Sequence, residues 1–293
     1  MTADAFRDHR DLALPGGPLR VYEAGPAAGR PVVLLHGAML DTAPFTWRHL
    51  MPVLARDHRV IAPDLPRHGG SRPWSGTLDQ ARLSAVLTGL LDRLEVERAD
   101  LVGLSMGGGL AIGHALDHPE RVRSVVASAP GGVEARRPAQ FATWLVSRSD
   151  ALLRWSAAWV AASPALLRRS MERSLAAGAR TPDFAGLMAL AGAEARLQGE
   201  HRQRVLDDWQ IVAYGPRRMR FDLSPRLPEL VPPSLWLHGE HDHLVPAEAV
   251  RRAAAAAPGG RFVPIAGAGH LAPLDRPGRF AELVTAFLAD AAG

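Results

Sequence analysis

Short apolar runs that alternate with helical stretches constrain the fold of this chain most strongly. The runs that read as strands are residues 19–24, 31–36, 60–62, 99–103, 122–127, 234–238 and 261–265. The stretches with helical character between and after them are residues 78–94, 106–117, 247–257 and 277–290. Strands that are apolar along their whole length indicate a parallel sheet that is buried on both faces. We therefore expect an α/β fold in which helices flank a mostly parallel sheet.

The strand pattern disappears between residues 131 and 226, where helical periodicity takes its place. An apolar helical face is formed by Trp144, Leu152, Trp155 and Trp159. We expect an all-helical insertion between two strands, with residues 1–130 and 227–293 forming the α/β core and residues 131–226 forming the insert. The tryptophans then either pack the insert onto the core or line a pocket.

The strongest local signal is the sequence Gly103-Leu104-Ser105-Met106-Gly107, which follows a predicted strand and precedes a predicted helix. A serine at so tight a turn adopts a strained backbone, and the flanking glycines avoid clashes. The turn lifts the hydroxyl clear of the sheet, and the start of the helix favours a developing negative charge. Ser105 is therefore the candidate nucleophile.

Serine needs a base, and the base needs a partner that fixes its tautomer. Two later strands end in loops that carry Asp242 and His270. Because the carboxyl ends of parallel strands share one edge, these side chains can reach the same edge as Ser105. Asp242 is the expected orienting acid and His270 the expected base, with Glu240 as the alternative acid.

An oxyanion needs two backbone N–H donors. The first candidate is Met106, directly after the nucleophile, and the second is Ala38, in the loop that follows strand 31–36, with Met39 as the alternative. We expect His36 to be a structural residue beneath this loop. His238, His241 and His243 suggest a metal site, but alternate positions in a loop diverge, so we predict no metal.

These motifs resemble those of α/β-hydrolase-fold enzymes along nearly the whole chain. The matching segments are His36-Gly37, Gly103 to Gly108, the Gly239 to Pro246 loop and Gly269-His270. The resemblance implies a Ser105–His270–Asp242 triad, and it implies that the insert is a lid over the pocket. One motif departs from the family, because Arg67 stands where a glycine is common, and Arg67 is predicted to point toward the site entrance.

Residue identities narrow the reaction within this family. Haloalkane dehalogenases and epoxide hydrolases need a carboxylate nucleophile, hydroxynitrile lyases of the plant type use a Lys, and proline iminopeptidases have an acidic lid. The carbon–carbon hydrolases usually carry Asn where Leu104 stands. We therefore predict a serine hydrolase that cleaves a carboxylic ester of a small, largely apolar substrate through an acyl-enzyme. The alternatives are a lactonase, a perhydrolase, or a non-hydrolytic biosynthetic or ligand-binding homologue.

Composition supports these expectations. The chain has no Cys, Lys or Asn, which excludes a Cys nucleophile, a Schiff-base enzyme and a P-loop. The insert holds 15 Arg against nine acidic residues, so the basic excess lies there. We expect no cofactor, no nucleic-acid partner, no membrane span and a cytoplasmic location, whereas the oligomeric state is open. The predicted substrate contacts are Met39, Trp144, Trp155, Trp159, Leu187 and Met188.

Overall fold

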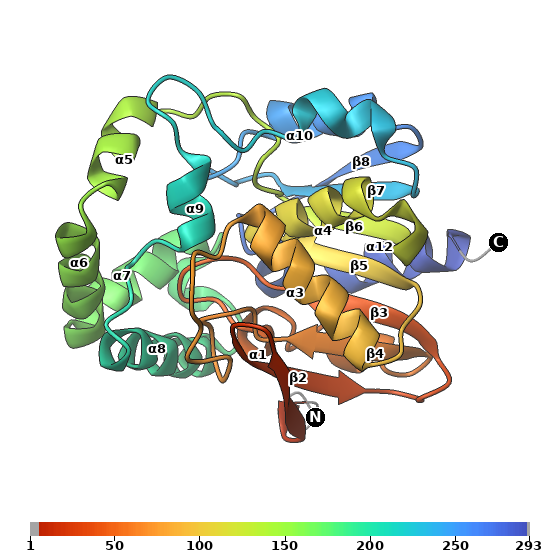
Figure 1. Cartoon of the computed structure of the whole chain (residues 1–293), viewed down its shortest axis with the longest axis horizontal. Helices are drawn as coiled ribbons and strands as arrows, with labels where there is room; N and C mark the ends of the chain where they lie inside the picture. Colours follow the sequence, from red (N-terminus) through yellow and green to blue (C-terminus); the bar gives the residue numbers. More distant parts are fainter. Residues whose placement is uncertain (1–5, 292–293) are drawn as a thin grey trace.

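The seven predicted strands and one further strand form an eight-stranded sheet in the computed structural model, which describes residues 6–291 (Figure 1). The strand order is β1-β2-β4-β3-β5-β6-β7-β8. All neighbours from β4 to β8 pair in parallel, and β2 pairs antiparallel with β1 and β4. The strands are β1 (His9–Leu14), β2 (Gly17–Ala24), β3 (Arg30–Leu35), β4 (His58–Pro63), β5 (Ala99–Leu104), β6 (Val122–Ser128), β7 (Ser234–Gly239) and β8 (Gly260–Ile265). The predicted α/β fold is confirmed, and β1 is the strand that the sequence pattern missed.

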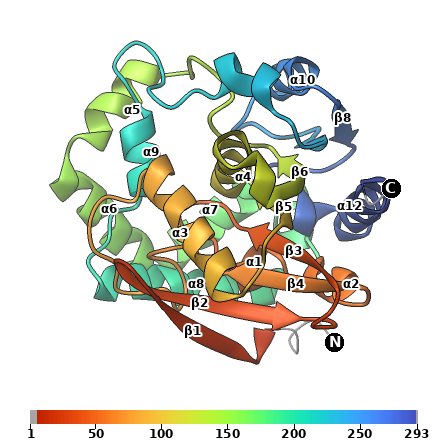
Figure 2. The same cartoon turned by 45° about the vertical axis from the view of Figure 1, so that its right-hand side comes forward.

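Helices cover both faces of this sheet (Figures 1 and 2). One face carries α3 (Gln80–Arg93), α4 (Met106–Asp117) and α10 (Ala247–Ala256). The other carries α1 (Ala43–Thr46), α2 (Met51–Leu54), α11 (Ala272–Asp275) and α12 (Pro277–Asp290). Side chains of β3 alternate between the two apolar cores, since Val33 lies in the first and Val32 and Leu34 lie in the second. This double burial explains why the strand is apolar throughout.

The segment between β6 and β7 is helical, as its periodicity predicts. Its helices are α5 (Gln140–Ser147), α6 (Asp150–Ala162), α7 (Pro164–Ser174), α8 (Phe184–Glu200) and α9 (Asp208–Ala213), with the short 3₁₀ turns η3 (Gly178–Arg180) and η4 (Ser224–Glu229), whereas the 3₁₀ turn η2 (Pro119–Arg121) precedes β6. Figure 1 shows α5 to α9 gathered at one end of the sheet. We refer to residues 131–226 as the helical insert.

Among the tryptophans of the helical insert, Trp209 of α9 packs in the apolar core on the α3 face of the sheet, whereas those of α5 and α6 do not pack the insert onto the sheet. Trp144 belongs to α5, whereas Trp155 and Trp159 belong to α6, where they stack on each other and are 60% and 54% exposed. The buried face of α6 is instead formed by Leu153 and Ala157. Because Leu153 and Ala157 are smaller than tryptophan, they allow α6 to approach its neighbour α8. The tryptophan rings remain on the solvent side of α6.

The helical insert is joined to the core at a neck where its two ends meet, along α8, and through Trp209 of α9, which lies in the apolar core. At the neck the N–H of Leu223 donates to the carbonyl of Gly132 at 2.7 Å. Along α8, Phe184, Leu187 and Ala191 enter the apolar core on the α12 face of the sheet. Within residues 6–291, no helix has the length and apolar character needed to cross a membrane.

Candidate active site

Ser105 lies at the sharp turn between β5 and α4, with φ 53° and ψ −113°. This left-handed conformation costs a non-glycine residue roughly 1–3 kcal/mol and is typical of functional sites. Close packing holds it in place, because a Cβ on Gly103 would lie 2.2 Å from the carbonyl oxygen of Gly107. A Cβ on Gly107 would in turn lie 2.1 Å from that of Leu35. The glycines on both sides of Ser105 are therefore required by the turn.

Asp242 and His270 form a hydrogen-bonded pair in the loops that follow β7 and β8. The Nδ1 of His270 lies 2.9 Å from Oδ2 of Asp242 and donates to it, since an ionised carboxylate only accepts. Burial would raise the pKa of Asp242, but the bond from His270 and the N–H groups of Leu244 and Val245 outweigh it and hold the pKa below its usual range. The carboxylate is therefore charged, and Nε2 of His270 is left as the basic nitrogen.

The competing residues of these loops have other contacts. Glu240 is exposed and accepts from the N–H of Gly267 at 2.9 Å, away from His270. His238 is buried and its Nε2 lies 2.8 Å from the carbonyl of Val245, whereas His241 is exposed. Across the described part of the chain, residues 6–291, no group of three or more His, Asp or Glu side chains is arranged to hold a metal ion.

The loop that follows β3 approaches Ser105 closely, because a Cβ on Gly37 would lie 3.6 Å from Cβ of Ser105. His36 lies beneath this loop with no exposed surface. Its Nε2 accepts from the N–H of Leu65 at 2.8 Å, and its Nδ1 donates to the carbonyl of Gly37 at 2.7 Å. Asp41 accepts from the N–H of Gly37 at 2.7 Å, and burial raises the pKa of this carboxyl to about 6. We refer to residues 36–41 as the β3 loop.

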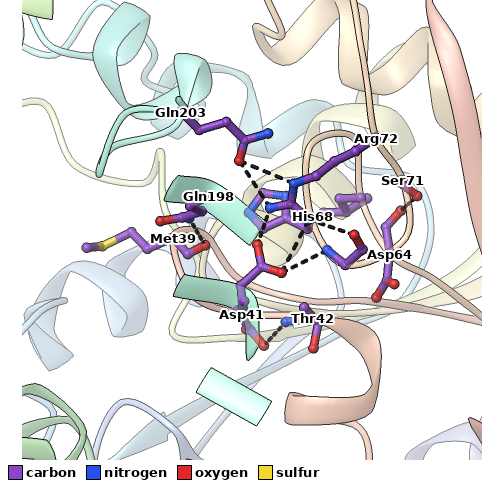
Figure 3. Close-up of polar contacts among 12 residues, drawn as sticks. Met39, Asp41, Thr42, Asp64, His68, Ser71, Arg72, Gln198 and Gln203 are labelled. Atoms are coloured by element: carbon purple, nitrogen blue, oxygen red, sulfur yellow. Dashed lines mark hydrogen bonds and ion pairs between the residues drawn. The ribbon is translucent and has the colours of Figure 1, made fainter. Parts of the chain in front are cut away.

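Met39 connects the β3 loop to the helical insert. It has φ 69°, and its N–H donates to Oδ2 of Asp207 at 2.7 Å. Its carbonyl accepts from the Nε2 amide of Gln198 at 2.8 Å (Figure 3). The N–H of Met39 is therefore occupied, while Ala38 donates to no acceptor among residues 6–291. Sequence reasoning missed Asp207 and Gln198, because isolated polar residues in a helical segment carry no pattern that reveals distant contacts.

Arg67 occupies the glycine position of the family motif with the backbone that a glycine would take, φ 68°. Its guanidinium contacts Oδ2 of Asp208 at 2.6 Å and the carbonyl of Gly76 at 2.7 Å. The side chain is thus held against α9 of the helical insert, where it lines a cavity that Met106 also lines.

The predicted substrate contacts lie in different environments. Met39 of the β3 loop is 37% exposed, and Trp144 on α5 is half-buried. Trp155 and Trp159 on α6 are exposed. Leu187 is 1% exposed within the apolar core, so packing accounts for it and substrate contact does not. Met188 packs at the edge of the same core.

Two cavities adjoin the site. One of about 850 Å³ lies between α7 and the loops after β7 and β8, and it is lined by His270 together with apolar and cationic side chains. Among these are Leu166, Arg169, Arg173, Leu175 and Leu244. A second, of about 310 Å³, is lined by Met106 and residues of α9 and its preceding loop.

Comparison with known proteins identifies the family of this chain. The alpha/beta hydrolase fold family matches residues 30–277, so the chain belongs to that family, and it is a hydrolase. A 2-hydroxymuconate semialdehyde hydrolase of Pseudomonas putida is 30% identical over 287 residues, covering 96% of this chain and 94% of the relative. An esterase of Thermogutta terrifontis has a TM-score of 0.76 at 24% identity, with 97% and 99% of the two chains covered. The enol-lactonase of Burkholderia xenovorans LB400 has a TM-score of 0.69 at 23% identity, with 96% and 100% covered.

Proposed function

We propose that this hydrolase cleaves a carboxylic ester of a small, largely apolar substrate through an acyl-enzyme on Ser105. The observation that carries the proposal is a serine held in a strained turn at the start of α4, on the same sheet edge as the His270–Asp242 pair. A strained nucleophile and an oriented base are the two parts that serine-based acyl transfer requires.

The proposed chemistry has two steps. Nε2 of His270 takes the proton of the Ser105 hydroxyl while Oγ attacks the ester carbonyl, and Asp242 stabilises the imidazolium that forms. The tetrahedral intermediate collapses, and the alcohol leaves with the proton from His270. A water molecule, deprotonated by the same nitrogen, then attacks the acyl-enzyme, and the acid leaves as Ser105 regains its proton.

Two backbone N–H groups are proposed to hold the oxyanion. Met106 is the first residue of α4, and the N–H of a first helical residue has no acceptor within the helix. Ala38 shares a planar peptide unit with the carbonyl of Gly37, which accepts from His36, so its N–H faces the opposite way from that bond. The alternative donor, Met39, is disfavoured because its N–H is bonded to Asp207.

The helical insert is proposed to act as a lid, with residues 1–130 and 227–293 as the core. The larger cavity beside His270 is lined by Leu166, Leu175 and Leu244 on its apolar side and by Arg169 and Arg173 on its cationic side, and the apolar side favours an apolar acyl or alcohol group. A series of p-nitrophenyl esters of increasing acyl length measures how large a group the site accepts. The proposed chemistry uses only side-chain and backbone groups of the chain and needs no cofactor.

A second candidate is hydrolysis of a carbon–carbon bond, because the relative with 30% identity is a 2-hydroxymuconate semialdehyde hydrolase. Leu104 weighs against it, since enzymes of that type usually have Asn beside the nucleophile. Incubation with 2-hydroxymuconate semialdehyde, followed by its absorbance, separates the two candidates. Matched assays with a lactone and with acetate plus peroxide examine lactonase and perhydrolase activity on the same triad.

The decisive test is labelling with a fluorophosphonate probe, which forms a covalent bond with an activated serine. We expect wild type to label and Ser105→Ala neither to label nor to hydrolyse p-nitrophenyl butyrate, with a rate loss on the order of 10⁴ or more. Circular dichroism provides the control for folding. Equal labelling of the Ala variant, or a folded wild type that does not label, contradicts the proposal.

A further inference from the structure

The conformation of the β3 loop is set from two sides. The core fixes its first two peptide units, because Asp41 accepts from the N–H of Gly37 and His36 donates to the carbonyl of Gly37. The next two peptide units are fixed by the helical insert, through Asp207 on the N–H of Met39 and Gln198 on its carbonyl. The N–H of Ala38 belongs to the second unit that the core fixes, directly before the first unit that the helical insert fixes.

Met39 needs such support. Its φ of 69° lies in the left-handed region, where a non-glycine residue is strained, and its side chain is 37% exposed. Side-chain packing is therefore incomplete, and the two hydrogen bonds from the helical insert are the specific contacts that hold this backbone. Without them, the two peptide units on either side of Met39 lose their partners, and the loop that carries the Ala38 N–H is held from the core side alone.

Asp207 is itself held in place by contacts with both the insert and the core. Its N–H donates to Oε1 of Gln210 at 3.0 Å, and its Oδ2 lies 3.5 Å from Nε2 of the buried His68. His68 belongs to the loop that follows β4, so Asp207 contacts two core loops at once. Burial would raise the pKa of Asp207, but the charge of His68 and the N–H of Met39 lower it. The acceptor is therefore a charged, immobile carboxylate.

Gln198 is anchored by the same interface. It is 4% exposed on α8, one helical turn after Glu194, which accepts from the N–H of Gly69 at 3.0 Å and pairs with Arg72. Figure 3 shows Gln198 beside Met39, with His68 and Arg72 close by. Glu194 and Arg72 are 2% and 3% exposed, so the contact between α8 and the β4–α3 connection excludes water.

We infer that Asp207 and Gln198 are positioning residues, which hold the β3 loop from the helical insert and so keep the Ala38 N–H in place for the oxyanion. The inference rests on the proposed function, since it assigns a role within that acyl transfer. The hydrolytic site is then completed only when α8 and the start of α9 are docked on the core. Substrate affinity depends on the cavity beside His270, whereas stabilisation of the transition state depends on the contact of Asp207 and Gln198 with the β3 loop.

The experiment compares Asp207→Ala, Asp207→Asn and Gln198→Ala with a matched control, Asp183→Asn, in the full chain. Asp183 also joins the helical insert to the core, through an ion pair with Arg48 at 2.5 Å, but it does not contact the β3 loop. The readouts are kcat and KM for p-nitrophenyl butyrate and the inhibition constant of a trifluoromethyl ketone, which forms a tetrahedral oxyanion adduct with serine.

We expect Asp207→Ala to lower kcat about 10- to 100-fold with little change in KM, because a misplaced oxyanion donor weakens only the transition state. Ketone inhibition should weaken by a similar factor. Asp207→Asn keeps an oxygen acceptor and should recover most of kcat, Gln198→Ala should lose less than Asp207→Ala, and Asp183→Asn should match wild type.

Two outcomes overturn the inference: an unchanged kcat in folded Asp207→Ala and Gln198→Ala, or an equal loss in Asp183→Asn. The second outcome would mean that a loosened insert in general, and not the loss of its hold on the β3 loop, lowers activity. Failure of the proposed function is recognised separately, because Ser105→Ala would then keep its activity whatever the Asp207 variants do.

Discussion

Asp242 has no exposed side-chain surface, and its charge is maintained by three donors, His270 Nδ1 and the N–H groups of Leu244 and Val245. The two backbone donors fix one carboxylate oxygen, and the other oxygen faces the imidazole. The orientation of His270 is therefore determined by the turn after β7, in addition to the ring's own packing. A substitution that changes the acceptor at position 242 should therefore alter the tautomer of His270 more than it alters the stability of the fold.

Replacement of Asp242 by Asn tests this arrangement. The amide presents a donor or a weaker acceptor to Nδ1, so the basic nitrogen of His270 is no longer selected, and we expect kcat to fall on the order of 10⁴-fold. Glu240→Gln is the matched control, since its side chain is 57% exposed and bonds Gly267. Hydrolysis of p-nitrophenyl butyrate measures both. If the Glu240 variant loses more activity, Glu240 is the triad acid.

At the scale of elements, α8 is the helix that ties the insert to the core. Its apolar side carries Leu187 into the core beneath the sheet, and its polar side carries Glu194 to the loop after β4. The exposed rings of α6 contribute little to this attachment, because Leu153 and Ala157 form the buried face of that helix. The helices of the insert therefore differ in their environment: α8 packs against the core, whereas α6 leaves its tryptophan rings exposed to solvent.

The variant Leu187→Ala should lower the free energy of unfolding by about 2–5 kcal/mol, because it leaves a cavity in a closely packed core. Leu145→Ala, at a leucine of α5 that is 56% exposed, is the control and should change it by less than about 1 kcal/mol. Urea unfolding followed by circular dichroism measures both. Similar losses in the two variants would contradict the packing role of Leu187.

The contact between His68 and the insert should respond to pH. Burial alone would lower the pKa of His68, but the carboxylates of Asp207 and Glu194 outweigh it and raise the pKa to about 9. Because this value lies above the ordinary pKa of about 6.5, the ion pair stabilises the fold fully below pH 6.5. The contribution is lost as pH rises through about 9.

Thermal unfolding of wild type and His68→Gln at pH 6, 8 and 10 measures this effect, since other titrating groups are common to both proteins. We expect wild type to unfold several degrees higher at pH 6, and the difference to disappear by pH 10. A constant difference over this range would show that the charge of His68 does not stabilise the contact.

For the whole molecule, elements that follow from periodic or local sequence patterns could be predicted from the sequence. Contacts between side chains that are distant in the sequence could not. The strands from β2 to β8 and the turn at Ser105 follow from apolar runs and from glycines at fixed positions. β1 was missed because four of its six residues are exposed, so that it carries no continuous apolar run. The pairing of Asp207 with Met39 joins residues 168 positions apart, and neither residue belongs to a repeating pattern.

The neck of the helical insert has a consequence for how the chain can vary in length. Leu223 N–H and the carbonyl of Gly132 are hydrogen-bonded, so the segment between them is a loop whose two ends already meet. The entropy of closing such a loop changes slowly, by about 0.6 kcal/mol for each doubling of its length. Residues can therefore be added or removed between the neck and α8 without disturbing the order of strands. The limit on such changes is set by two side chains, since whatever its length, the segment must return Gln198 and Asp207 to Met39.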